Sequence, residues 1–220
     1  MVYVIVTGRS LLWVLMSLVS TVLMLVAFAS PVWLVGMPKS ISYGNETRLY
    51  NPSIGVYSRC KEPSRDGSNC NTLAVRGLLT DPEVFPDAWK AACVFLGTGL
   101  AIMTFTVFCS VAGCCYQSIC KKSIFTVAGS AQVVAGMFYI LVLFLFPMAW
   151  SSRRVQALCG REVSHFYPAD CSFGLGMWIA IVGTALTFCT AYISIYADKA
   201  TSSDHVQDQI SDGRTLICLP

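Results

Sequence analysis

Four long apolar segments set the strongest limit on what this chain can fold into. Each is long enough to cross about 30 Å of hydrocarbon, for which a helix needs about 20 apolar residues. None of the four contains Asp, Glu, Lys, Arg or His. We therefore predict an all-α membrane bundle with four transmembrane helices, at residues 10–30, 91–115, 124–146 and 173–196.

The composition agrees with a membrane protein. Hydrophobic residues make up 55% of the 220 residues and charged residues only 12%, a profile that is unusual for soluble domains. The net charge of +3 is small and spread thinly along the chain. Nucleic acid is therefore not expected as a partner.

The first apolar segment has an alternative interpretation as a signal peptide. Arg9 supplies a basic flank, and Ala27-Phe28-Ala29 is similar to a signal-peptide cleavage site. However, the apolar run of roughly 20 residues is longer than a signal h-region of about 7–15 residues. The length favours a span that is retained in the mature protein.

Two features of the loops set the expected orientation. Basic residues near the span ends divide evenly between the two sides, so the positive-inside rule does not decide. The sequon at Asn45 can be glycosylated only in the lumen, and paired loop cysteines need an oxidising compartment. We expect a plasma-membrane glycoprotein delivered by the secretory pathway, with both termini in the cytoplasm. The cytoplasmic segments are then the N-terminus (residues 1–9), the inner loop (116–123) and the tail (197–220). The two outer loops are residues 31–90 and 147–172.

The first outer loop is too long to be a simple connector, so recognition is expected there. Ser53–Cys60 and Asn71–Val75 have the composition of two strands. Asp81-Pro82-Glu83 is typical of a helix start, with aspartate as the N-cap and proline at the first helical position. We predict a small extracellular antiparallel sheet on the four-helix bundle.

The outer loops contain an even number of cysteines. Cys60 and Cys70 lie in the first loop, and Cys159 and Cys171 in the second. Pairing within each loop is the shortest solution, and each bond should stabilise its loop by roughly 2–3 kcal/mol. We expect these disulfides to be structural, without chemistry of their own.

Trp33, Tyr57 and Arg59 are the candidate interface residues. Tyrosine and arginine often anchor protein interfaces, and in a continuous strand residues 57 and 59 share one face. The alternative for Tyr57 is that it packs the sheet onto the helices. Trp33 follows the first span, where interfacial tryptophans are common.

The spans carry a few polar and small side chains. Gln132 is the one strong amide in any span, and it either makes an interhelical hydrogen bond or lines a pathway. The first interpretation is favoured because ion and proton pathways usually need ionisable groups. Gly176, Ala180 and Thr184 form a stripe suited to close helix packing, as do Ser17 and Thr21.

The inner cysteines could suggest a metal site. The chain has only two histidines and no Cys-x-x-Cys pair, so zinc is poorly supported. Cys114, Cys115 and Cys120 lie beside two lysines and are palmitoylation candidates, with buried inert thiols as the alternative. We expect no cofactor, no metal and no catalytic residues, since no nucleophile has a base beside it in the sequence.

The motifs together resemble a known group of membrane proteins. Trp33, the run Gly55–Cys60 and Cys70 are similar to the first-loop signature of the claudin-like tetraspan superfamily, although Tyr57 stands where claudins have a second tryptophan. Phe146–Trp150 resembles the pattern at the end of span three in the lipoma HMGIC fusion partner-like (LHFPL) tetraspan family. The resemblance extends over essentially the whole chain and implies a four-helix bundle topped by an extracellular β-sheet, without enzymatic activity.

Three functions follow as expectations. Members of that family act as auxiliary subunits, so we expect an accessory or scaffold protein that binds, traffics or stabilises channels, receptors or adhesion complexes. Its partners would be other integral membrane proteins and the bilayer, with a homo-oligomer possible. The alternatives are a claudin-like cell–cell junction protein and, less favoured, a small transporter or channel.

Overall fold

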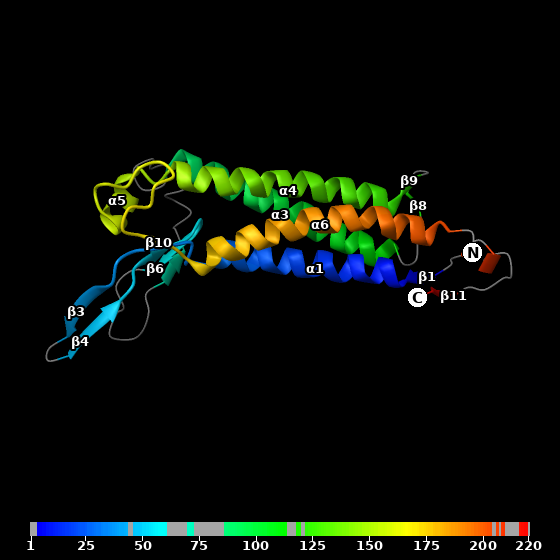
Figure 1. The fold of residues 1–220 in the computed structure, drawn as a ribbon, viewed down its shortest axis with the longest axis horizontal. Coiled ribbons are helices and arrows are strands. Elements are labelled where there is room, and N and C mark those ends of the chain that lie inside the picture. The colour runs from blue at the N-terminus through cyan, green and yellow to red at the C-terminus, as the bar shows by residue number, and fades with distance from the viewer. Residues whose placement is uncertain are drawn as a thin grey trace. The chain divides into compact units, whose positions relative to one another are not determined.

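The computed structural model describes residues 4–43, 46–60, 70–72, 86–113, 118–119, 122–203, 206, 208–209 and 216–219. Its long helices are α1 (Gly8–Ala29), α3 (Asp87–Gly113), α4 (Ile124–Met148) and α6 (Leu175–Thr201), and the short helix α5 (Arg153–Cys159) follows α4 (Figure 1). All four long helices are long and apolar enough to cross a membrane. The predicted fold class, four membrane-length helices with small sheets, is confirmed.

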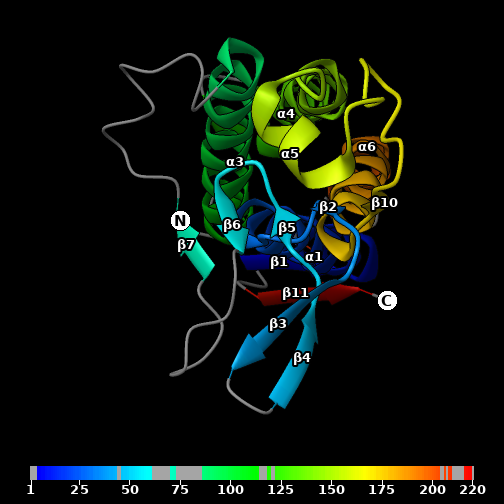
Figure 2. The ribbon, with the colours of Figure 1, turned by 90° about the vertical axis from the view of Figure 1, so that its left-hand side faces the viewer.

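The strands are short and belong to small sheets. The largest sheet has the antiparallel order β10 (Ser172–Phe173), β2 (Leu34–Val35), β5 (Ser53–Ile54), β6 (Ser58–Cys60) and β7 (Cys70–Thr72). Figure 2 shows β3 (Lys39–Tyr43) and β4 (Glu46–Tyr50) as a separate hairpin. Two further pairs are the parallel β1 (Val4–Thr7) with β11 (Leu216–Leu219), and the antiparallel β8 (Ser118–Ile119) with β9 (Lys122–Ser123).

The chain divides into two compact units. Unit 1 comprises residues 1–23, 98–138 and 183–220, and unit 2 comprises residues 24–97 and 139–182. The largest sheet and the β3–β4 hairpin belong to unit 2, whereas the other two strand pairs belong to unit 1.

Unit 1 begins with a capped helix. The Thr7 amide donates to Ser10 Oγ over 3.0 Å, and the Ser10 amide donates to Thr7 Oγ1 over 3.1 Å. This reciprocal pairing satisfies amides that have no partner inside the first turn, which is why α1 begins at Gly8. One turn further on, the buried Trp13 ring meets Phe125 edge-on at 5.3 Å and packs in a cluster with Ala128 and Ala197.

Unit 2 has a core of large aromatic rings. Trp89 stacks on Phe146 with centroids 5.4 Å apart, and its Nε1 donates to the Phe146 carbonyl oxygen over 3.0 Å. Trp33 and Trp150 contact the same Phe146 ring at 5.1 and 6.1 Å. All four side chains are buried, so one phenylalanine near the end of α4 joins three tryptophans from separate parts of the chain.

Some sequence predictions for the loops require correction or lie outside the described residues. Phe173, expected to open the fourth span, lies in β10, and α6 begins at Leu175. The predicted second strand is present as β7, Cys70–Thr72, but residues 73–75 lie outside the described part of the chain. The predicted helix start at Asp81-Pro82-Glu83 also lies outside it.

Candidate interaction surfaces

Trp33 lies in the core of unit 2 rather than on its surface. Its exposed fraction is 0%, and its Nε1 donates a 2.7 Å hydrogen bond to the Ala27 carbonyl oxygen. A Cβ on Gly176 would lie 2.7 Å from Trp33 Cδ1, so the missing side chain at Gly176 lets α6 approach the indole. Trp33 has no surface to offer a partner, which corrects the prediction that it is a contact residue.

The predicted strand Ser53–Cys60 is two strands joined by a tight turn. The Gly55 amide donates to the Ser58 carbonyl oxygen over 2.7 Å, which turns β5 back alongside β6. A Cβ on Gly55 would collide with the Ser30 carbonyl oxygen. The β-favouring residues around Gly55 therefore do not form one continuous strand, because the chain turns where the Gly55 backbone lies against the Ser30 carbonyl oxygen. An isolated glycine inside a strand pattern is the sequence signal for such a feature.

Tyr57 packs the turn against the end of α1. Its ring stacks on Phe28 with centroids 5.6 Å apart and an interplanar angle of 22°. This contact agrees with the packing alternative for Tyr57. Arg59 lies in β6, where its register partners are Ile54 and Asn71. Because Tyr57 precedes β6, the argument that residues 57 and 59 share one face of a strand no longer applies.

The cysteines of the two predicted outer loops lie at or next to the ends of described strands and helices. Cys60 is disulfide-bonded and stands opposite Cys70 in the β6–β7 register. Cys159 and Cys171 form a disulfide with their Cα atoms 5.0 Å apart. That bond joins the end of α5 to the residue before β10, so it closes the segment between them.

The segment closed by Cys159 and Cys171 presents two aromatic side chains, which sequence reasoning missed. Phe166 is 53% exposed and Tyr167 is 56% exposed. Phe166 and Ala169 have φ of 61° and 50°, a left-handed conformation that bulky side chains seldom adopt. Such strain persists only where the surrounding structure imposes it, and it is often found at functional sites.

Hydrogen bonds hold this aromatic pair in place. The Ser164 amide donates to the Tyr167 carbonyl oxygen over 3.2 Å, and the Tyr167 amide donates back over 3.1 Å. The Phe166 amide donates to the Pro147 carbonyl oxygen over 3.4 Å, and His165 Nε2 lies 3.1 Å from Ser151 Oγ. We call Phe166 and Tyr167 the aromatic tip. Two adjacent aromatics in a polar loop were its only signal in the sequence.

The β3–β4 hairpin is a second exposed feature that sequence reasoning missed. Among the described strands, β3 and β4 pair only with each other, and Leu49 on β4 is 75% exposed. An isolated two-stranded hairpin is marginally stable in water, so further contacts would be expected to stabilise it. Gly44-Asn45, between the strands in the sequence, is a dipeptide typical of hairpin turns.

In unit 1, Gln132 makes interhelical hydrogen bonds. Its side chain is fully buried, its Oε1 accepts from Trp13 Nε1 over 3.3 Å, and its Nε2 donates to Ser17 Oγ over 2.9 Å. The amide therefore joins α4 to α1, and the favoured sequence prediction for Gln132 is confirmed. The alternative, a residue that lines a pathway, gains no support because both the oxygen and the nitrogen of the Gln132 side chain are hydrogen-bonded.

Small residues in the same unit bring the helices close together. Ser20 Oγ lies 2.8 Å from Thr187 Oγ1, which joins α1 to α6. A Cβ on Gly129 of α4 would collide with the Ser194 hydroxyl of α6. The predicted stripe along α6 is buried in both units, at Gly176 and Ala180 in unit 2 and at Thr184 in unit 1. These residues serve packing inside the protein, as their spacing predicts.

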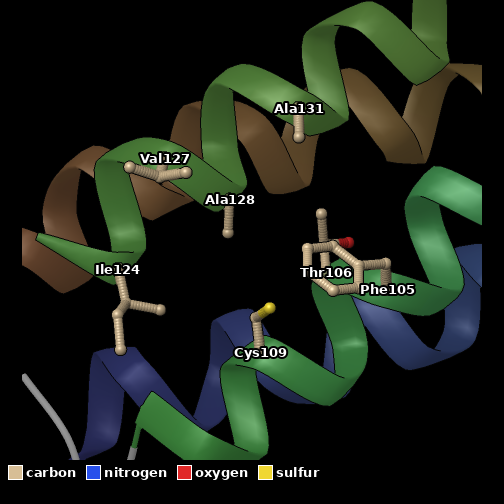
Figure 3. A pocket seen from close by; sticks show the side chains of 7 residues that line it. All are labelled: Phe105, Thr106, Cys109, Ile124, Val127, Ala128 and Ala131. Atoms are coloured by element: carbon tan, nitrogen blue, oxygen red, sulfur yellow. The ribbon is translucent and has the colours of Figure 1, made fainter. Parts of the chain in front are cut away.

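An apolar groove lies between α3 and α4 in unit 1. Its volume is about 250 Å³. Figure 3 shows its two walls, three side chains from α3 opposite four from α4: Phe105, Thr106, Cys109, Ile124, Val127, Ala128 and Ala131. We call this feature the α3–α4 groove.

Several predicted modification sites are outside the described residues. Asn45 lies there, as do Cys114, Cys115 and Cys120. Glycosylation and palmitoylation at these positions therefore stay predictions. Cys109, which lines the α3–α4 groove, is partly buried and free.

Comparison with known proteins extends over the whole chain. The profile of the family described as "Lipoma HMGIC fusion partner-like protein" matches residues 9–197. The chain is 40% identical to the LHFPL tetraspan subfamily member 2a protein of Danio rerio over 228 aligned positions, covering 100% of both chains. It is also 40% identical to the Homo sapiens LHFPL tetraspan subfamily member 2 protein, again covering 100% of both. A Xenopus tropicalis LHFPL tetraspan subfamily member 7 protein is 27% identical, covering 84% of this chain and 88% of that relative.

Proposed function

Because the chain belongs to the lipoma HMGIC fusion partner-like tetraspan family, we propose that it is a non-enzymatic accessory protein that binds other integral membrane proteins. It supports their assembly or delivery to the plasma membrane. The partner contacts the extracellular part of unit 2, and both termini lie in the cytoplasm.

The aromatic tip is the observation that carries this proposal. Phe166 and Tyr167 are each more than half exposed, yet hydrogen bonds and the Cys159–Cys171 disulfide fix their backbone. A fixed aromatic pair loses little conformational freedom on binding, so it can anchor an interface efficiently. A side chain exposed only by chance would not need a left-handed backbone at Phe166.

Quantitative co-purification from native membranes tests the proposal. In the double variant Phe166→Ser with Tyr167→Ser, recovery of the specific partner should fall about tenfold or more, which corresponds to the loss of one anchor residue. The matched control carries Arg161→Ala with Glu162→Ala, exposed residues of the same segment that are outside the aromatic tip. Equal partner recovery from both variants, at equal surface delivery, would contradict the proposal.

A second pair of variants distinguishes an extracellular interface from one in the membrane. Arg59→Glu should reduce partner recovery without reducing surface delivery, since β6 belongs to the proposed outer domain. Ala180 has no exposed surface, so the membrane-facing control is its exposed neighbour, Val182→Ser. Loss of the partner from Val182→Ser alone would move the interface to the helices.

The proposed orientation has its own test. Glycosidase treatment should shift the mobility of the wild-type chain but not of Asn45→Gln, because a sequon is used only in the lumen. A protease added to intact cells should leave a tag on the carboxyl terminus uncut. Cleavage of that tag in intact cells would overturn the four-span orientation.

A further inference from the structure

The α3–α4 groove has no role in the proposed binding of a partner protein. We propose that the groove binds one acyl chain of an anionic phospholipid, with the lipid phosphate beside the position of Lys122. The inference rests on the chemistry of the groove, its shape and its place along the two helices.

The lining of the groove is suited to hydrocarbon and not to water. Six of its seven side chains end in carbon or sulfur. The exception, Thr106, donates its hydroxyl to the Met103 carbonyl oxygen over 2.8 Å, so that donor is already engaged within α3. A buried water needs two to four polar partners, whereas cavities with apolar walls stay dry and accept apolar ligands.

The shape fits a flexible chain better than a helix. Figure 3 shows Ala128 and Ala131 on the α4 wall, facing Cys109 and Thr106 on the α3 wall. The groove stays open between them because the alanine methyl groups are too short to reach the opposite wall. A cavity of about 150 Å³ accepts benzene, so about 250 Å³ holds a stretch of acyl chain. A partner helix about 10 Å across would not enter it.

The groove is open to the surroundings of the helices. Phe105 on one wall is 67% exposed, and Val127 on the other wall is about half exposed. Both helices are long and apolar enough to span a membrane, so the medium at these exposed edges is lipid in the proposed topology. A lipid chain can therefore enter from the side without any movement of the protein.

The end of the groove lies close in sequence to basic residues. Ile124, which lines the groove, is the first residue of α4, and Lys122 in β9 precedes it by two positions. Lys121 is adjacent in the sequence. A phosphate at this level would be near the lysine position while its acyl chain extended along the groove. Basic residues beside a span favour anionic over zwitterionic headgroups.

Native mass spectrometry of the purified full-length chain tests the site. The probes are phosphatidylglycerol and phosphatidylcholine with identical acyl chains, and the readout is the number of lipids retained per chain. The wild type should retain one phosphatidylglycerol preferentially. Phe105→Ala should weaken its retention about tenfold by removing one apolar wall.

Phe108→Ala is the matched control for the wall. Phe108 lies on the same helix and is 71% exposed, but it does not line the groove, so this variant should retain lipid like the wild type. Ala131→Leu tests the same site in the opposite way, because it fills the groove and should also weaken retention. Equal retention by Phe105→Ala, Phe108→Ala and Ala131→Leu would overturn the proposal.

The headgroup contact is tested separately with Lys122→Glu and its control, Lys199→Glu near the end of α6. Lys122→Glu should abolish the preference for phosphatidylglycerol over phosphatidylcholine, and Lys199→Glu should preserve it. Preference lost equally in both would contradict the assigned phosphate position.

An acyl group attached to Cys109, recognised by its release with neutral hydroxylamine, would likewise overturn the site, because the groove would then hold a covalent chain instead of a bilayer lipid.

Discussion

Unit 1 and unit 2 are held together by different kinds of side chain. In unit 1 one aromatic contact, Trp13 with Phe125, accompanies a larger set of small and polar ones. These are Gln132 with Ser17, Ser20 with Thr187, and Gly129 against Ser194. In unit 2 the same chain depends on large rings, with three tryptophans around Phe146. Unit 2 also contains the Cys159–Cys171 disulfide and disulfide-bonded Cys60, together with free Cys93, whereas in the described part of unit 1 Cys109 and Cys189 are free.

The difference follows in part from the solvent in the proposed topology, because unit 2 contains the outer loops in addition to parts of the four long helices. Lipid tails are as apolar as leucine, so helices in a membrane gain little from burying apolar surface and depend on close packing and hydrogen bonds. A domain in water gains about 25 cal/mol for each Å² of apolar surface that it buries, and large rings bury the most. Small and polar contacts therefore predominate along the spans in unit 1, and large rings predominate in unit 2, where the ends of α3 and α4 join the loops.

The largest expected effect comes from removing a ring of the unit 2 core. Trp33→Ala should lower the free energy of unfolding by about 3–5 kcal/mol, as is typical when a buried aromatic is truncated. Trp178→Ala is the control, because that tryptophan is 56% exposed. Thermal unfolding of both variants in the same detergent measures the difference. Similar losses would show that burial in the unit 2 core is not the source of stability.

A smaller loss is expected from a backbone contact in unit 2. Gly55→Ala places a Cβ against the Ser30 carbonyl oxygen, and such overpacking costs about 1–3 kcal/mol. Gly97→Ala is the matched control, since no described heavy atom beyond its chain neighbours and the adjacent backbone of its own helix lies within 4 Å of a Cβ built there. Denaturation curves should separate the two variants. If Gly55→Ala is as stable as the wild type, the tight turn does not require glycine.

The smallest effect is expected in unit 1. Gln132→Leu removes the hydrogen-bond partner of Trp13 Nε1 and of Ser17 Oγ, at a cost of about 1 kcal/mol, because single interhelical hydrogen bonds in membranes are weak. Val134→Leu, at a half-exposed site on the same helix, should be neutral. A loss as large as that of Trp33→Ala would remove the contrast between the units.

The contrast between unit 1 and unit 2 also explains which features of the fold could be predicted from the sequence. The spans and the interhelical role of Gln132 follow from composition, because a lone amide among apolar residues must find a partner on a neighbouring helix. The role of Trp33 did not follow, because a tryptophan after a span is equally typical of the membrane interface and of a core.

Unit 2 was less predictable for a related reason. The turn at Gly55 and the backbone of Phe166 each depend on contacts with segments that are distant in the sequence. Local residue preferences describe a strand but not the point at which another backbone forces it to turn. The α3–α4 groove was also invisible in the sequence, since it results from the residues that two helices place opposite each other.

Hydrogen exchange measured by mass spectrometry tests the central claim, that each unit is stabilised by its own type of contact, most directly. Trp33→Ala should accelerate exchange of buried amides in residues 24–97 and 139–182, and Gln132→Leu should do so in residues 98–138 and 183–203. Each variant should leave the other unit close to its wild-type rate. Equal acceleration of both units by either variant would contradict the account.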